Sequence, residues 1–241
     1  EKSMSNKWKE VWNRREVNWE KLEKNQDEFV LYKELKRLDG FDVQVQDQDT
    51  YYRRFYDSIL YLWKEKMNDP QSVFEVGCGS GANLFLFNRR KILGGGIDYS
   101  KKLIDVAKQI LPDGDITVGE AINITPCRQY DVVMSDGVFA YFESIEYGKN
   151  VLRKMYDKAR NVVMLLEIFD KEKERECISH RRSMVPEYDR IYKDLDKIFY
   201  PKELFVNFAA ENNCTIEFDT VKNEYYWNSQ YLYNCYIYKN R

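Results

Sequence analysis

Hydrophobic positions along this chain follow two different periods, one typical of helices and the other of buried strands. A spacing of three and four residues marks the stretch from Lys7 to about Asp39 and the stretch from Thr50 to Met67, and it predicts helices. Short apolar runs bounded by Gly, Pro, Asn or Asp follow, and these predict strands. The strand candidates are residues 73–76, 91–98, 115–118, 130–134, 161–167, 215–221 and 231–238.

Helical segments separate these strands through the middle of the chain. They are predicted at residues 82–90, 101–111, 148–159 and 201–212. Regular alternation of strand and helix is typical of an α/β fold with parallel strands, and it predicts five of them here. The run from Asn161 to Glu167 is apolar almost throughout, as expected for a strand that is buried on both faces.

The first strand ends in an unusual glycine pattern. Glu75 is followed by Gly77, Gly79 and Gly81 at alternate positions, and glycine lets a strand turn sharply into a helix because it accepts positive φ and close backbone approach. A dinucleotide-binding turn has the spacing G-x-G-x-x-G and holds a pyrophosphate. The carboxylate of Glu75 would repel a pyrophosphate but suits a cation, so we expect a different nucleoside ligand.

Three further strand ends carry polar or small residues. Asp98 ends the second strand about 20 residues beyond the glycines, where an acid can accept hydrogen bonds from ribose hydroxyls. The alternative is that Asp98 caps the helix beginning near Ser100. Glu120 and Ala121 follow the third strand, and residues 135–137 follow the fourth. Ligands of open α/β sheets bind outside the carboxyl ends of the strands, so these four ends predict one crevice.

The pattern Glu75-x-Gly77-x-Gly79-x-Gly81, with the acid at Asp98, resembles motif I and the following strand of the class I S-adenosylmethionine-dependent methyltransferases. The resemblance covers roughly residues 71–241. It implies a Rossmann-like three-layer sandwich whose mostly parallel seven-stranded sheet has the order 3-2-1-4-5-7-6, with the last strand antiparallel. It also implies S-adenosylmethionine as methyl donor and S-adenosylhomocysteine as product. The implied cofactor-binding residues are Glu75, Gly77, Cys78, Gly79, Gly81, Asp98, Tyr99, Glu120, Ala121, Ser135, Asp136 and Gly137.

Length and pattern suggest how the chain is organised. With 241 residues and 44% hydrophobic content, it is long enough for one substantial core. We expect a helical extension or lid over residues 1–69 and the methyltransferase domain over 70–241. We expect Trp8, Trp12 and Trp19 of the extension either to pack against the sheet domain or to form part of a lid over the cofactor. The charged stretch at about 170–200 is an insertion, and the resemblance places substrate recognition there.

The charge balance indicates which partners the protein binds, and the cysteine content indicates its cellular compartment. The 38 basic and 40 acidic residues leave a net charge of -2, which gives no drive toward nucleic acid or a membrane surface. The five scattered cysteines and the polar first residues predict a cytoplasmic protein with reduced thiols. No metal-ligand spacing is present. We expect a monomer or homodimer that acts on a small-molecule acceptor.

The candidate catalytic residues are His180, Asp136 and Tyr141, with Glu167 as a weaker fourth. His180 is the only histidine, and histidine has its ordinary pKa nearest neutrality. The resemblance places the loop with Asp136 and Tyr141 against the transferred methyl group. Beside His180, Arg181 and Arg182 have the guanidinium fork that suits a phosphate or carboxylate.

These observations favour methyl transfer to a hydroxyl of a sugar or glycoconjugate precursor. Such an acceptor needs a base to remove its proton, whereas an amine needs mainly orientation. The alternatives are an N-methyltransferase of a small amine or protein side chain, a non-catalytic cofactor-binding subunit, and a nicotinamide-dependent enzyme.

Overall fold

One seven-stranded sheet organises the molecule. The computed structural model describes residues 7–22, 27–41 and 45–240. Within these ranges the strand order is β3-β2-β1-β4-β5-β7-β6, which confirms the predicted order. Strands β1 to β5 pair in parallel, and β7 is antiparallel to both β5 and β6. The strands are β1 Ser72–Val76, β2 Leu93–Asp98, β3 Asp115–Val118, β4 Tyr130–Asp136, β5 Ala159–Phe169, β6 Cys214–Thr220 and β7 Leu232–Lys239.

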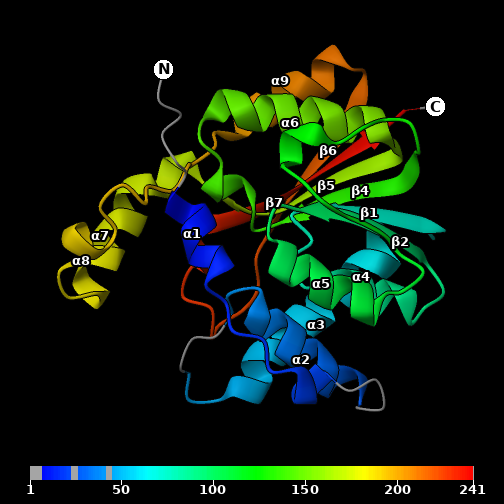
Figure 1. Cartoon of the computed structure of the whole chain (residues 1–241). Helices are drawn as coiled ribbons and strands as arrows, with labels where there is room; N and C mark the ends of the chain where they lie inside the picture. Colours follow the sequence, from blue (N-terminus) through cyan, green and yellow to red (C-terminus); the bar gives the residue numbers. More distant parts are fainter. Residues whose placement is uncertain (1–6, 23–26, 42–44, 241) are drawn as a thin grey trace, which may run out of the picture.

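Helices cover both faces of the sheet. Figure 1 shows α6 and α9 on one side and α2 to α5 on the other. The α-helices are α1 Lys7–Asn13, α2 Glu28–Leu38, α3 Gln48–Glu65, α4 Ala82–Asn88, α5 Lys101–Ile110, α6 Ile145–Lys158, α7 Glu174–Met184, α8 Tyr188–Ile191 and α9 Lys202–Glu211. Short 3-10 turns are η1 Trp19–Leu22, η2 Ala121–Asn123, η3 Phe139–Tyr141, η4 Lys171–Lys173 and η5 Ser229–Tyr231. None of the described helices is both long and apolar enough to cross a membrane.

The alternation of side chains along each strand divides the core into two layers. Val132 and Met134 of β4 pack with the layer that contains residues of α2 to α5, whereas Val133 between them packs with α6 and α9. In β5, Met164 and Leu165 face opposite layers in the same way. The central strands are therefore buried on both faces, as predicted for residues 161–167.

The predicted helical stretch from Lys7 to Asp39 is not one helix. Helix α1 ends at Asn13, and a new helix, α2, begins at Glu28. Asp27 starts α2 afresh, because its Oδ1 accepts hydrogen bonds from the backbone N of Phe29 at 2.9 Å and of Val30 at 3.3 Å, as an N-cap does.

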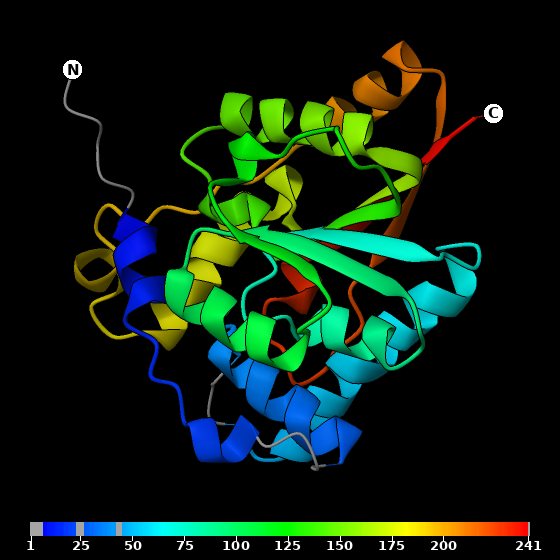
Figure 2. The same ribbon diagram turned by 45° about the vertical axis from the view of Figure 1, so that its right-hand side comes forward.

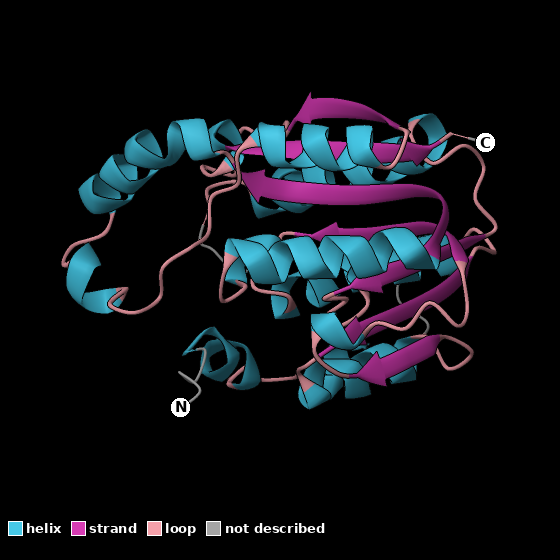
Figure 3. Ribbon diagram, turned by 90° about the horizontal axis from the view of Figure 1, so that it is seen from above, coloured by secondary structure: helices cyan, strands magenta, loops and turns pink. Residues whose placement is uncertain are grey.

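The insertion after β5 lies beside α1. Figure 2 shows the α7 and α8 ribbons next to α1, and Figure 3 shows the insertion arching beyond the sandwich. Trp8 Nε1 of α1 donates to the carbonyl oxygen of Asp196 at 3.2 Å, and Lys7 pairs with Asp194. Segments distant in the sequence therefore meet beyond the ends of the strands.

Strand β2 contains three consecutive glycines, Gly94 to Gly96, so it has no side chains at these positions. A Cβ atom at Gly95 would lie 2.4 Å from Tyr130 Oη, whereas one at Gly94 would meet only Leu84, at 3.7 Å. We expect Gly95→Ala to lower the free energy of unfolding by about 1–3 kcal/mol through overpacking. The matched control Gly94→Ala should change it by less than about 1 kcal/mol. Urea unfolding of both variants measures the difference, and equal stabilities would contradict this account of the strand.

Candidate active site

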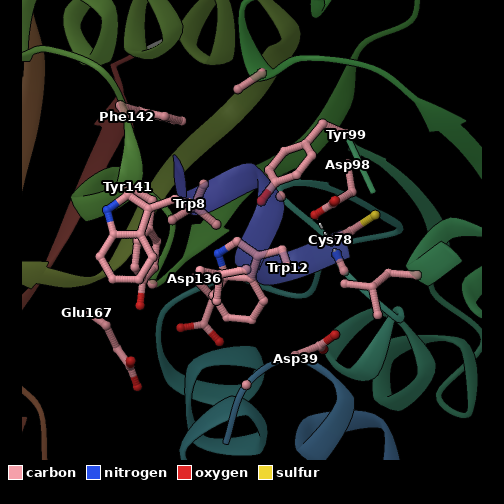
Figure 4. A pocket seen from close by; sticks show the side chains of 18 of the residues that line it. Trp8, Trp12, Asp39, Cys78, Asp98, Tyr99, Asp136, Tyr141, Phe142 and Glu167 are labelled. Atoms are coloured by element: carbon pink, nitrogen blue, oxygen red, sulfur yellow. Dashed lines mark hydrogen bonds between the residues drawn. The ribbon is translucent and has the colours of Figure 1, made fainter. Parts of the chain in front are cut away.

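A cavity of about 410 Å³ lies at the carboxyl edge of the parallel strands (Figure 4). The structure brings twelve of the predicted cofactor-binding and catalytic residues to its lining: Glu75, Gly77, Cys78, Gly79, Asp98, Tyr99, Glu120, Ala121, Asp136, Gly137, Tyr141 and Glu167. Three others do not line it. Gly81 precedes α4 as its N-cap and faces Ala107 of α5 and Leu111 just after that helix. Ser135 is buried within β4, and His180 lies in the insertion.

The glycine loop and Asp98 form one hydrogen-bonded unit. Gly77, Gly79 and Gly81 all have positive φ, which explains why glycine stands at these positions. The backbone N of Gly79 donates to Asp98 Oδ2 at 3.0 Å, and the backbone N of Ser100 donates to Asp98 Oδ1 at 2.8 Å. Helix α5 is capped by Ser100 itself, so Asp98 orders the loop while it faces the cavity.

Helix α2 forms part of this site, although the sequence pattern predicted no site residue in it. Asp39 follows the helix, and its Oδ1 accepts from the backbone N of Ser80 at 2.7 Å, while Ser80 Oγ donates to the Leu35 carbonyl oxygen at 3.0 Å. A Cβ atom at Gly79 would lie 2.4 Å from Asp39 Oδ1. Position 79 therefore has no room for a side chain, because the carboxyl group of Asp39 packs directly against it. Burial raises the pKa of Asp39 to about 7.

A buried ionic cluster lies below the glycine loop. Lys36 Nζ of α2 is 3.0 Å from Asp136 Oδ2, and Asn83 Nδ2 donates both to Asp136 Oδ2 at 3.0 Å and to Glu75 Oε1 at 2.8 Å. Glu75 Oε2 is buried without a hydrogen-bond partner among the described residues. Burial, with the charge of Asp136 beside it, raises the pKa of Glu75 well above its ordinary value.

The same charges act on Lys36. Burial by itself would lower the pKa of this ammonium, but the acidic groups around it, Asp136 foremost and Glu167 as well, together outweigh burial and raise the pKa above its ordinary value. Lys36 therefore stays charged at neutral pH. It and Asn83, both absent from the sequence-based site, hold the strand-end acids in place.

Glu167 reaches the cavity from an irregular end of β5. The pairing of β5 with β7 shifts register between Leu165 and Ile168, and Glu167 has a left-handed backbone with φ of +56°. Its backbone N donates to Asn234 Oδ1 at 2.9 Å, which supports this strained conformation. Burial, reinforced by Asp136, raises the pKa of Glu167 to about 8. A buried carboxyl with this pKa is suited to proton transfer.

Helix α1 closes one side of the cavity. The rings of Trp8 and Trp12 lie 4.8 Å and 5.7 Å from that of Tyr141 between centroids, in edge-to-face contacts. Lys9 Nζ is 2.6 Å from Glu120 Oε1. Trp8 and Trp12 thus pack and line the cavity together, whereas Trp19 is exposed. Burial raises the pKa of Tyr141 to about 12.

The insertion contributes Arg181, Tyr192 and Lys197 to the lining, but not His180. His180 Nδ1 lies 2.9 Å from Tyr231 Oη, and its ring packs against Trp227. Arg182 is exposed, and its Nε donates to Asp189 Oδ1 at 3.0 Å. Successive residues of α7 point in different directions, so the structure does not bring His180 together with Asp136 and Tyr141.

Comparison with known proteins agrees with this geometry. A family model described as a methyltransferase domain matches residues 74–161, which run from the glycine loop through β4 into β5. Over this stretch the chain is therefore similar to methyltransferases, and the cofactor that this similarity indicates is S-adenosylmethionine. Within the described ranges, no group of three or more His, Cys, Asp or Glu side chains is arranged to hold a metal ion.

One curated protein that resembles this chain is malonyl-[acyl-carrier protein] O-methyltransferase from Priestia megaterium. It is 25% identical over 103 residues, which cover 41% of this chain and 36% of the relative. The match therefore spans about a third of that protein.

Two solved structures share the fold over most of this chain. One is magnesium protoporphyrin IX methyltransferase from Synechocystis with bound S-adenosylhomocysteine, with a TM-score of 0.60, 14% identity, and coverage of 89% of this chain and 100% of that one. The other is the N-methyltransferase NodS from Bradyrhizobium japonicum, with a TM-score of 0.61, 12% identity and coverage of 89% and 100%.

The raised pKa of Asp39 predicts how the stability of the ligand-free protein depends on pH. An acid whose pKa is higher in the folded state stabilises the fold below its unfolded pKa of about 4, and this stabilisation is lost as pH rises to about 7. Asp39→Asn keeps an oxygen for Ser80 N but carries no charge. We expect it to be more stable than wild type by about 1–3 kcal/mol at pH 8, with the advantage shrinking toward pH 5. Urea unfolding at both pH values measures this, and a difference independent of pH would contradict it.

Proposed function

We propose that this enzyme transfers the methyl group of S-adenosylmethionine to a hydroxyl of a small polar acceptor, a sugar or glycoconjugate precursor. One observation carries the proposal. A single cavity joins the glycine loop and Asp98 at one end to Glu167 and Tyr141 at the other. The proposed cofactor site and a buried proton acceptor therefore face the same enclosed space.

The acid-rich half of the cavity fits the cofactor. The unpartnered Glu75 Oε2, with Asp136 beyond Asn83, would accept hydrogen bonds from the cofactor's ammonium. Asp98 would accept from the ribose hydroxyls, while Glu120 and Ala121 would lie beside the adenine. When bound, the cofactor supplies a methyl group on a sulfonium. The buried carboxylates would stabilise the positive charge of the sulfonium, and they repel one another when no cofactor is bound.

The other half of the cavity suits a small ring. Tyr141, Phe142 and Trp227 offer aromatic faces to the cavity, and Asn228 and Glu167 offer polar groups. Aromatic faces with hydrogen-bonding groups at their edges fit a polar ring such as a sugar. Because α1 closes one side, a small molecule fits this space better than a folded protein or a nucleic acid.

Glu167 is the proton acceptor that the geometry supports best. A general base works best when its pKa lies near the working pH, and burial brings Glu167 to about 8. Asp136 is held by Lys36 and Asn83, so we assign it to positioning. Tyr141, 3.2 Å from Lys197 Nζ, would orient the acceptor. His180 lies outside the cavity lining, so the role expected for it passes to Glu167.

We also place the enzyme in the cytoplasm. Its five cysteines are all free in the structure, and that compartment keeps thiols reduced.

Binding experiments test the cofactor assignment. Isothermal titration calorimetry should show micromolar-range binding of S-adenosylmethionine and none of NAD. Asp98→Ala should weaken the binding at least about tenfold, because charged hydrogen bonds to the ligand and to the loop are lost. Asp105→Ala, at the exposed Lys101–Asp105 pair of α5, is the matched control and should bind as wild type. Binding of NAD in place of S-adenosylmethionine would overturn the assignment.

Turnover experiments test the base and the acceptor atom. Candidate acceptors are screened by mass spectrometry for the gain of one methylene. With a hydroxyl acceptor, kcat at saturating acceptor should rise with pH until Glu167 has lost its proton, near pH 8. Glu167→Gln should lower kcat about 10²-fold or more and leave the affinity for S-adenosylmethionine near that of wild type.

Glu211→Gln, at the exposed end of α9, is the control and should keep full activity. Full activity of Glu167→Gln with an unchanged pH profile would contradict the role of Glu167. A methyl group found on nitrogen would favour the alternative N-methyltransferase.

A further inference from the structure

Two cationic side chains of the insertion line the cavity at its acceptor end. Arg181 belongs to α7, and Lys197 lies in the segment between α8 and β6. Both lie over the ring of Phe169, at 5.9 Å for the Arg181 Cζ and 4.8 Å for the Lys197 Nζ. The fold therefore brings two positive charges to one aromatic surface.

Arg181 is buried, and no acidic side chain of the described residues forms an ion pair with it. Its residue exposure is 6%, and its Nε has no hydrogen-bond partner among the described residues. Its Nη2 donates to Asn228 Oδ1 at 3.3 Å, and its guanidinium lies 4.7 Å from the Trp227 ring centroid, with Cys177 beside it. A buried charged donor that lacks an acceptor costs free energy. The contacts to Asn228 and Trp227 nevertheless hold the guanidinium at the cavity wall.

Lys197 also lacks a counterion among the described ion pairs. Its Nζ donates to Tyr141 Oη at 3.2 Å and lies 4.9 Å from the centroid of that ring. Burial, together with the charge of Arg181, lowers the pKa of Lys197 to about 7. The nearby acid Glu167 has its pKa raised to about 8, so it is mostly neutral at pH 7 and does not balance the two cations.

We propose that Arg181 and Lys197 form an anion subsite that binds a carboxylate or phosphate group of the methyl acceptor. This inference rests on the proposed function, because it assumes that the acceptor occupies this end of the cavity. The guanidinium presents a fork of donors to the anion, and Lys197 adds a second charge. The rest of the acceptor, which carries the anionic group, packs against the aromatic rings of Tyr141, Phe169 and Trp227. The acceptor is therefore an anion attached to a compact ring or chain.

Arg182 provides an internal comparison. It follows Arg181 directly in α7, but it is exposed and pairs with Asp189. The guanidinium of Arg182 thus has a carboxylate partner and does not line the cavity. This contrast makes Arg182→Met the matched control for Arg181→Met.

Binding of simple probes to the full-length chain tests the subsite. Phenyl phosphate, phenylacetate and the uncharged benzyl alcohol are titrated in the presence of S-adenosylmethionine, with tryptophan fluorescence as readout. We expect at least one of the anions to bind about tenfold or more tightly than benzyl alcohol, because charge-assisted hydrogen bonds form only with the anions. Which anion binds more tightly distinguishes a phosphate from a carboxylate. Arg181→Met should lose about tenfold in affinity for it, and Arg182→Met should lose none.

The pH dependence isolates Lys197. The wild-type affinity for the anion should fall as pH rises through about 7, because Lys197 loses its charge. The groups facing it are Arg181 and Cys177 from α7, Tyr141 from η3 and Glu167 from β5. Glu167 gains negative charge at somewhat higher pH and acts in the same direction. Lys197→Arg keeps its charge, so its affinity should fall only with the titration of Glu167.

Binding of S-adenosylmethionine to each variant separates the possible failures. If the wild type does not bind it, the proposed function fails. If the wild type binds it but benzyl alcohol binds as tightly as both anions, or Arg181→Met keeps the preference, the anion subsite is wrong. Thermal unfolding shows whether Arg181→Met folds. If it does not, Lys197→Met takes its place, with the same tenfold loss expected and an unchanged preference again contradicting the proposal.

Discussion

The buried ion pair between Lys36 and Asp136 is the interaction on which the site depends. It joins α2 to the end of β4, and through Asn83 it holds Glu75 at the end of β1. Removing either partner of such a pair leaves an uncompensated buried charge, which is costly. The N-terminal helices are therefore fixed to the carboxyl edge of the sheet by charge as well as by packing. The same placement of α2 brings Asp39, three residues beyond Lys36, to the glycine loop.

The cavity separates charge along its length. Carboxyl groups gather at the end near the glycine loop, and Arg181 and Lys197 stand at the end formed by the insertion. Burial keeps these fields strong because little water is present to screen them. Such an arrangement favours a cationic methyl donor at one end and, as we propose, an anionic acceptor at the other. Glu167 lies at the acceptor end, with its backbone held in a conformation that non-glycine residues rarely adopt.

Much of the fold followed from local pattern. Alternate glycines after an apolar strand, and Asp98 at the end of the next, identified the cofactor turn because its chemistry needs particular residues at particular short spacings. The central strands were found because burial on both faces requires a continuous apolar run. Local pattern failed where contacts are distant in sequence. Nothing near Lys36 or Asp39 indicates that they meet residues 40 to 100 positions away, and no local signal shows which side of α7 faces the cavity.

The amino-acid sequence by itself indicated the strands and the class of cofactor, because both depend on residues within one strand or one turn. The order of the sheet came from the resemblance to the class I methyltransferases. Only the tertiary structure decided which charged side chains share the cavity. It brought in Lys36, Asp39 and Arg181 and left His180 beside Tyr231. The reason is geometric. Along a helix, neighbouring residues point about 100° apart, so the choice between His180 and Arg181 depends on how α7 is rotated against the body of the protein. That rotation is set by packing between segments far apart in the chain.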